Sequence, residues 1–409
     1  MICKQSKSKK LTFIAIICSS LLVVSCKNTT ATATATATDT KIQVKKSNNI
    51  TSTNTLKAIA NTNALYCPKG SENLQLNLSN VKLTRAKNIP LMYQGYNNIE
   101  GPVWHDGALY YSNMGSHQPD KNGFILSNQT TIWRWSPGNQ PQIWMKDSAA
   151  GSNGLALDNQ GDLVATRQLD GSLSSINWKT KQVTPIVSAF QSKRFNSPND
   201  LTITYDNNVY FTDPNWNTPS NINVVDTQGG GQPGSIESGQ RIYHVDVNKK
   251  VNATKVTELL PALGDKPNGI ILSLDQQQLI VGGLQGLWAF DLKLGEVSNP
   301  EQLLDTPIDG LGKDCSGNIY VTTTRKMPER KDGQVVVVLN KKYKEVGELP
   351  VEGIHIVTNI AFGGNDGKTL FVTSLTAPME GDKRRLCGNT PCLKAGIYTT
   401  KLNVQGFPF

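Results

Sequence analysis

Short apolar runs alternate with polar turns along most of the chain, and one such pattern recurs six times. Each copy begins with a polar residue, usually followed by glycine. It continues through apolar residues, a tight turn and a second alternating run, which ends in Thr or Ser in five of the six copies. The copies begin at Glu100, Asn153, Asn199, Asn268, Asp309 and Asn359, with separations of 53, 46, 69, 41 and 50 residues. Repeats of this length indicate an array of similar supersecondary units.

A second pair of strands is expected after the first pair in most copies. The pattern predicts strands over 131–135 and 142–146, over 172–177 and 182–186, and over 241–246 and 254–259. Four short strands about every 40–55 residues are typical of a propeller blade, and no segment has sustained helical periodicity. The sequence therefore predicts an all-β, six-bladed β-propeller over residues 64–409. Either the alternating leucines of 74–78 or the segment 397–404 is expected to supply the strand that closes the ring.

The first 63 residues do not share this pattern. Four lysines precede an apolar run over 11–24, and the segment Val-Val-Ser-Cys that ends at Cys26 resembles the lipobox of bacterial lipoproteins. We interpret residues 1–25 as a lipoprotein-type signal peptide and Cys26 as the lipidation site, with an ordinary secretory signal as the alternative. Residues 26–63 are of low complexity and are expected to form a flexible tether. The protein is thus expected on the periplasmic or cell-surface side of a bacterial membrane, held there by its lipid anchor alone.

The distribution of charge excludes a nucleic-acid partner. The chain has 41 Lys and Arg against 32 Asp and Glu, a net charge of +9. Residues 1–90 carry +11 of this charge, and residues 91–409 carry −2. Nucleic-acid binding depends on a basic surface, which the repeat region lacks. We expect a monomer that acts on a small molecule.

Four cysteines remain once Cys3, Cys18 and Cys26 are assigned to the leader. Cys387 and Cys392 flank a turn-forming Gly-Asn-Thr-Pro segment and are the favoured disulfide pair, while Cys67 with Cys315 follows only by elimination. A zinc site lacks the second pair of ligands that it would need.

The polar residue that opens each repeat is expected to point into the central channel of the propeller. Together these residues provide two carboxylates and four carboxamides, without His or Cys. Such an oxygen-only set suits Ca²⁺ or Mg²⁺. Asn or Asp before Gly also serves ordinary turns. Six polar residues in phase, two of them acids that would repel each other without a cation, favour a central metal site.

The repeats carry further motifs that together resemble a known family. These are EGPVW at 100–104, RFNSPNDL at 194–201, YFTDP at 210–214, PNGI at 267–270, DGL at 309–311 and TNIAFGG at 358–364. The segments look like the senescence marker protein/gluconolactonase family, which includes regucalcin, over about residues 85–405. The resemblance implies a six-bladed propeller that binds one divalent cation, usually Ca²⁺, although Mg²⁺, Zn²⁺ or Mn²⁺ would also serve. It implies that the ligands are Glu100, Asn199, Asn268 and Asp309.

The same resemblance implies an activity, the hydrolysis of a sugar lactone. The metal would polarise the carbonyl, and Asp309 would assist the attack of water as general base. Five residues are expected to contact substrate: Asn153, Asn199, Asn359, His117 and Arg167. The Gly-rich segment 215–240 is expected to be a long loop that covers one face.

Two alternatives stay open. The chain could be a related propeller hydrolase of other lactones or organophosphates, or a non-catalytic tethered propeller whose Ca²⁺ is structural. Serine-hydrolase and nucleotide-binding functions have no support, because the chain lacks a Gly-x-Ser-x-Gly elbow and a phosphate-binding glycine loop.

Overall fold

The computed structural model divides the chain into two units, Met1–Ile59 and Ala60–Phe409. It describes residues 67–87, 97–116, 130–147, 151–191, 193–214, 216, 240–246, 255–260, 266–293, 295–327, 330–351, 356–376 and 394–407, and short pieces of 379–391. The expected signal peptide, Cys26 and tether lie outside this part of the chain. Over the described ranges, no helix has both the length and the apolar character needed to cross a bilayer.

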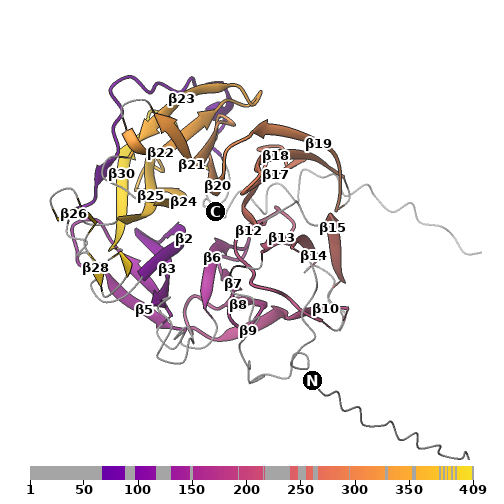
Figure 1. The fold of residues 1–409 in the computed structure, drawn as a ribbon. Coiled ribbons are helices and arrows are strands. Elements are labelled where there is room, and N and C mark those ends of the chain that lie inside the picture. Colours follow the sequence, from indigo (N-terminus) through magenta and orange to yellow (C-terminus); the bar gives the residue numbers. More distant parts are fainter. Residues whose placement is uncertain are drawn as a thin grey trace, which may run out of the picture. The chain divides into compact units, whose positions relative to one another are not determined.

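Six four-stranded antiparallel sheets follow one another around a central axis (Figure 1). Blade 1 contains β2 (Asn97–His105), β3 (Ala108–Ser116), β4 (Thr131–Trp135) and β5 (Gln142–Lys146). Blade 2 contains β6 (Ser152–Leu157), β7 (Leu163–Arg167), β8 (Ser172–Ile176) and β9 (Val183–Val187). Blade 3 contains β12 (Leu201–Ile203), β13 (Asn208–Asp213), β14 (Arg241–Asp246) and β15 (Lys255–Leu260).

The remaining blades follow the same order from the axis outward. Blade 4 contains β16 (Pro267–Leu272), β17 (Gln278–Gly283), β18 (Gly286–Lys293) and β19 (Glu296–Leu304). Blade 5 contains β20 (Ile308–Lys313), β21 (Ile319–Met327), β22 (Arg330–Leu339) and β23 (Glu345–Pro350). Blade 6 contains β24 (Ile356–Gly363), β25 (Thr369–Thr376), β30 (Lys394–Lys401) and β1 (Thr84–Arg85). The predicted six-bladed propeller is confirmed, and the predicted outer strands agree with β4, β5, β8, β9, β14 and β15 to within one residue at each end.

One short helix and three short hairpins complete the described structure. The 3-10 helix η1 (Ser71–Asn73) precedes β1, and β10 (Ala189–Phe190) pairs with β11 (Lys193–Arg194) between blades 2 and 3. Two further hairpins, β26 (Met379–Glu380) with β27 (Lys383–Arg384) and β28 (Leu386–Cys387) with β29 (Thr390–Pro391), interrupt blade 6.

Both ends of the repeat region close blade 6. Strand β30 is the third strand and β1 is the outermost, where Thr84 pairs with Thr399 and Arg85 with Tyr398. The alternating leucines before β1 do not form a strand. Instead, Leu76 and Leu78 pack against the apolar cluster of blades 5 and 6, and Leu74 is exposed. The two candidate closing segments therefore act together, because the early segment covers the blade and the late segment completes its sheet.

The core consists of six apolar clusters, one at each interface between neighbouring blades. Between blades 3 and 4, for example, Tyr210 packs with Ile270 and Val281. Alternate residues of the inner strands face opposite neighbours. Ala156 packs towards blade 3, whereas Leu155 and Leu157 pack towards blade 1. This alternation has the two-residue period of β-strands and explains why the inner runs are apolar throughout.

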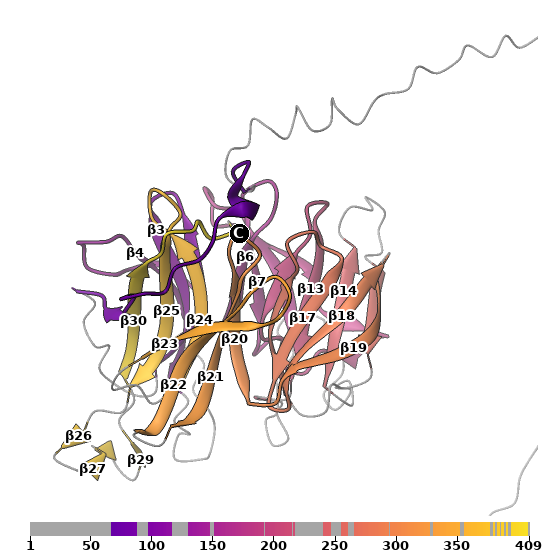
Figure 2. The same ribbon diagram turned by 90° about the horizontal axis from the view of Figure 1, so that it is seen from above.

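One end of the central channel is closed by the two ends of the described chain. Asp314, directly after β20, bridges to Gly406, and the Phe407 amide donates to the Lys313 carbonyl at 2.9 Å. A disulfide joins Cys315 on the same turn to Cys67. Figure 2 shows η1 and the C-terminus on this face and the β26–β29 hairpins on the opposite face. Because Asp309 lies four residues before Lys313 on β20, the site is displaced from the closed end towards the hairpin face.

The Cys67–Cys315 disulfide is the pairing that the sequence analysis reached only by elimination. Its two cysteines are 248 residues apart, and only the closed ring brings them together. Cys392, one member of the favoured pair, lies outside the described residues, so the Cys387–Cys392 pairing stays a prediction.

Candidate functional site

In five of the six repeats the polar residue lies at or beside a β-bulge in the inner strand. Pairing with the second strand shifts after Glu100, around Asn153, around Asn268 and around Asp309. Asn199 lies two residues before β12 begins. A bulge locally breaks the ladder and re-aims side chains, and the bulges displace these polar residues from regular pairing beside the axis.

Close packing of the inner strands explains the glycine that follows the polar residue. At Gly101, Gly154, Gly269 and Gly310, an added Cβ would lie less than 3.0 Å from backbone atoms of the next blade. Those atoms belong to the next polar residue in the ring, for example the Asn153 carbonyl at Gly101 and the Asp309 carbonyl at Gly269. Packing beside the channel therefore requires the glycine of each polar-Gly pair, whereas the polar residue before it differs between blades.

Two blades depart from the polar-Gly pattern, and both departures belong to the site. In blade 3 the glycine position is occupied by Asp200, which the sequence analysis missed although PND in place of PNG signals it. In blade 6, Val357 pairs with Ser374 and Ile360 with Val372, so the bulge contains Thr358 and Asn359. By this register, Thr358 occupies the position of the other polar residues, and Asn359 occupies the glycine position. The assumed phase of Asn359 was wrong by one residue, because Asn alone does not reveal the register of a bulge.

Asp200 and Asn359 meet across the channel. Blades 3 and 6 are opposite in the ring, and Asn359 Nδ2 donates to Asp200 Oδ2 at 3.2 Å and to Glu100 Oε2 at 3.4 Å. Two glycines leave room for these side chains, because an added Cβ would lie 2.8 Å from Asp200 Oδ1 at Gly154 and 2.4 Å from Asn359 Oδ1 at Gly310. On the other side, the Asn268 side chain donates a hydrogen bond to the Asp309 carboxylate. The structure therefore brings residues of five blades together.

The three carboxyl groups of the site strongly disfavour joint ionisation. Burial, with the charges of Asp309 and Asp200, raises the pKa of Glu100 well above its ordinary value. Burial and then the charge of Asp200 raise the pKa of Asp309, against the opposing hydrogen bond from Asn268. Burial also raises the pKa of Asp200 to about 6. Converging acids with raised pKa values are characteristic of functional sites, and a bound cation would reverse their mutual repulsion.

The donor set fits a hard divalent cation. Among the described residues, no three His, Cys, Asp or Glu side chains lie close enough to hold a metal without other ligands. A cation here would therefore need amide oxygens. Asn268 offers one beside Asp309, and Asn199, buried just before β12, is the second predicted amide ligand. Asn268 donates its amide group to Asp309, which leaves its carbonyl oxygen as the metal donor. Mixed carboxylate and amide oxygen sets are typical of Ca²⁺ sites.

The expected substrate contacts lie in different surroundings. Asn153 is buried on β6, Asn199 is buried just before β12, and the amide of Asn359 donates to Asp200 and Glu100. His117 lies outside the described residues, as does nearly all of the expected loop 215–240. The role of these residues towards substrate stays a prediction.

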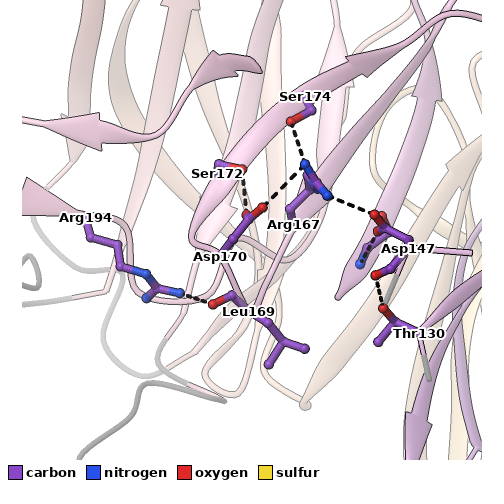
Figure 3. Close-up of polar contacts among 9 residues, drawn as sticks. Thr130, Asp147, Arg167, Leu169, Asp170, Ser172, Ser174 and Arg194 are labelled. Carbon is purple, nitrogen blue, oxygen red and sulfur yellow. Dashed lines mark hydrogen bonds and ion pairs between the residues drawn. The ribbon is translucent and has the colours of Figure 1, made fainter. Parts of the chain in front are cut away.

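Arg167 is held within the wall of blade 2 (Figure 3). Its Nη2 lies 2.9 Å from Asp147 Oδ1, and its Nη1 lies 3.4 Å from Asp170 Oδ2 and 3.3 Å from Ser174 Oγ. Asp147 is itself buried and also accepts from the Ser152 amide at 3.2 Å. A substrate would have to share this guanidinium with two carboxylates, so Arg167 has an evident structural role and its contact with substrate stays a prediction.

The loop that delivers Asn199 and Asp200 is fixed by a fully buried carboxylate. Asp213, at the end of β13, accepts from the amides of Asn196 at 2.9 Å and Ser197 at 2.8 Å. Arg194 donates to the carbonyls of Phe195 and Asn196, both at 2.9 Å. The motif from Arg194 to Leu201 is thus a structural unit that holds two site residues in place.

Comparison with known proteins identifies the family of the chain. Residues 99–376 match the family model described as SMP-30/Gluconolactonase/LRE-like region, and the chain belongs to this family. A gluconolactonase of Zymomonas mobilis is 24% identical over 255 residues, which are 54% of this chain and 64% of that protein. The match thus spans less than two thirds of the curated relative.

Solved structures share the fold at low sequence identity. A gluconolactonase of Xanthomonas campestris matches with a TM-score of 0.56 and 19% identity, covering 83% of this chain and 94% of that one. A luciferin-regenerating enzyme matches with a TM-score of 0.54 and 17% identity, covering 80% and 98%. Regucalcin of Agrobacterium tumefaciens, a calcium-binding protein, matches with a TM-score of 0.50 and 16% identity, covering 77% and 93%. Because these relatives have different functions, the fold alone does not assign an activity.

Proposed function

We propose that this protein is a Ca²⁺-dependent lactonase that opens a sugar lactone. The observation that carries the proposal is the convergence of Glu100, Asp309 and Asp200 with amide side chains at the channel axis. The gluconolactonases among the relatives support the reaction, and the calcium-binding regucalcin supports the metal. Glu100, Asn199, Asn268 and Asp309 would hold the cation, which when bound supplies Lewis-acid polarisation of the lactone carbonyl.

Asp309 is proposed to move the proton. As a carboxylate it accepts a proton from the attacking water, and it then returns that proton to the ring oxygen released from the carbonyl carbon. The ester C–O bond breaks, a new C–O bond forms to water, and the product is a hydroxy acid. The hydrogen bond from Asn268 orients the carboxylate and favours its ionised form. Asn153 and Asn199 are proposed to orient the substrate.

We also propose that the protein is exported and lipid-anchored at Cys26. The Cys67–Cys315 disulfide supports export, because stable disulfides form mainly in oxidising compartments. The sequence of residues 1–26 supports the anchor.

A substrate panel tests the proposed reaction. The full chain, loaded with Ca²⁺, is assayed against aldonolactones, acyl lactones and a phosphotriester, each with a blank for spontaneous hydrolysis. We expect the highest kcat/KM for an aldonolactone. A phosphotriester turned over at least as well would favour the related hydrolase instead. No turnover of any compound, together with tight Ca²⁺ binding, would favour the non-catalytic propeller.

A further inference from the structure

Four blades carry a buried threonine opposite the bulge of the inner strand. These are Thr166, Thr212, Thr322 and Thr373, on the second strand of blades 2, 3, 5 and 6. Each hydroxyl accepts a hydrogen bond from an amide of its own inner strand. The donors are Gly154 at 2.8 Å, Asp200 at 3.1 Å, Gly310 at 2.7 Å and Asn359 at 3.0 Å. The Thr near the end of these four repeats thus has a structural role.

Three of these hydroxyls also donate to the neighbouring blade, and the fourth, Thr373, forms a hydrogen bond with the Thr358 hydroxyl of its own blade at 2.8 Å. Thr166 donates to the Asn199 carbonyl at 2.6 Å, Thr212 to the Asn268 carbonyl at 2.7 Å, and Thr322 to the Thr358 carbonyl at 3.2 Å. Thr358 extends this series of hydrogen bonds to blade 1, because its hydroxyl donates to the Ile99 carbonyl at 2.8 Å. A hydroxyl is both donor and acceptor, so one threonine links two blades. We call the five residues Thr166, Thr212, Thr322, Thr358 and Thr373 the hydroxyl belt.

The hydroxyl belt is interrupted at two places. In blade 1 the equivalent residue is Ser112, whose buried hydroxyl has no partner among the described residues. In blade 4 it is Gly282, where a Cβ would collide with Ile308. The belt therefore forms two arcs, one across blades 2, 3 and 4 and one across blades 5, 6 and 1.

The two arcs divide the proposed ligands by charge. The first arc carries the amides Asn199 and Asn268, and the second carries the carboxylates Glu100 and Asp309. A cation bound by all four residues would join the arcs, and its coordination would depend on the spacing that each arc maintains. Thr212 links two residues of the site directly. Its hydroxyl accepts a hydrogen bond from the backbone amide of Asp200 and donates one to the backbone carbonyl of Asn268.

We infer that Thr212 is a positioning residue of the cation site, which sets the separation of Asp200 and Asn268 without touching the metal. The inference rests on the proposed function, since it concerns the same site. Loss of the hydroxyl removes one hydrogen bond from the backbone at Asp200 and one from the backbone at Asn268, so the backbone that carries the Asn268 ligand side chain loses a fixed point. Outer residues that orient metal ligands typically contribute about 10-fold to 100-fold to metal affinity.

The test compares Ca²⁺ affinity in three variants of the full chain by titration calorimetry after removal of bound metal. Thr212→Val keeps the shape and removes the hydroxyl, and we expect its Kd for Ca²⁺ to rise about 10-fold. Thr212→Ser keeps the hydroxyl and should stay close to wild type. Thr202→Val is the matched control, because Thr202 is buried on β12 of the same blade and its hydroxyl has no partner among the described residues. Its Kd should not change.

The outcomes separate this inference from the proposed function. If wild type binds Ca²⁺ and Thr212→Val binds it equally well, the positioning role is wrong and the proposed function stands. If Thr202→Val loses as much affinity as Thr212→Val, the effect is general packing and the inference also fails. If wild type binds no divalent cation, both proposals fail. Should Thr212→Val not fold by circular dichroism, Thr322→Val on the other arc decides by the same criterion, because it serves Gly310 beside Asp309.

Discussion

Replacing Asp309 by asparagine is expected to lower kcat/KM for lactone hydrolysis by about 10³-fold, the typical contribution of a general base. The substitution keeps the size of the side chain but removes the proton acceptor and one anionic ligand. It should not unfold the protein. In the absence of metal it should increase stability, because it removes a buried carboxyl that repels Asp200 and Glu100. The measurements are steady-state kinetics with Ca²⁺ and thermal unfolding without it.

The same substitution should also change how the stability of the metal-free protein depends on pH. The folded state raises the pKa of Asp309, so the folded protein binds this proton more tightly than the unfolded chain does. Without metal, this group's stabilising contribution is present in acid and is lost as the pH rises from about 4 towards neutrality. Asp309→Asn should lack this part of the loss. A metal-free variant with an unchanged pH profile would contradict the raised pKa.

Asp314 supplies a matched control at the other end of the same strand. It is buried and accepts four hydrogen bonds, from the Ser316 amide, the Asn318 amide and side chain, and the Tyr320 hydroxyl. Asp314→Asn should lower stability by about 1–3 kcal/mol, as expected for unpaired buried groups, and leave kcat/KM of the folded protein unchanged. Unaltered activity in Asp309→Asn, or equal losses in both variants, would contradict the role given to Asp309.

Removal of the Cys67–Cys315 disulfide is expected to lower the free energy of unfolding by about 3–5 kcal/mol, because it closes a loop of more than 200 residues. It also ties down the segment that covers blade 6 and ends in β1. The Cys67→Ser, Cys315→Ser double variant should therefore unfold at clearly lower urea concentration. Its kcat/KM should remain near that of wild type, because the disulfide is at the closed end of the channel and Asp309 is displaced from it.

Reduction of the wild-type protein provides the control for the double variant. If this disulfide alone matters, reduced wild type and the double variant should unfold at the same urea concentration. A larger loss in reduced wild type would reveal a contribution from the predicted Cys387–Cys392 pair, which Cys387→Ser with Cys392→Ser would then abolish. An unchanged urea midpoint in the Cys67→Ser, Cys315→Ser variant would contradict the stabilising role of this disulfide.

The repeat made the fold predictable, because each blade shows a period of two and ends in turn residues. The closure of the ring was less predictable, because the two outer strands of blade 6, β30 and β1, come from opposite ends of the repeat region. Strand β1 has only two residues and carries no strand pattern of its own. The site was predictable at Glu100, Asn268 and Asp309, which precede a glycine that packing requires. Asp200 broke that pattern and was overlooked for this reason, while the position of Asn359 depended on a bulge register that only the paired strands define. Arg167 could not be placed, because its partners Asp147 and Asp170 come from the surrounding wall.

The central claim is that a cation held at the channel axis is required for lactone hydrolysis. The most direct measurement is the initial rate of aldonolactone opening by the full chain before chelation, after removal of metal with a chelator, and after addition of excess Ca²⁺. The account predicts a rate that falls to that of the blank on chelation and returns with Ca²⁺. A rate unaffected by chelation, or a chelated protein that loses only thermal stability while no lactone is turned over in any state, would contradict it.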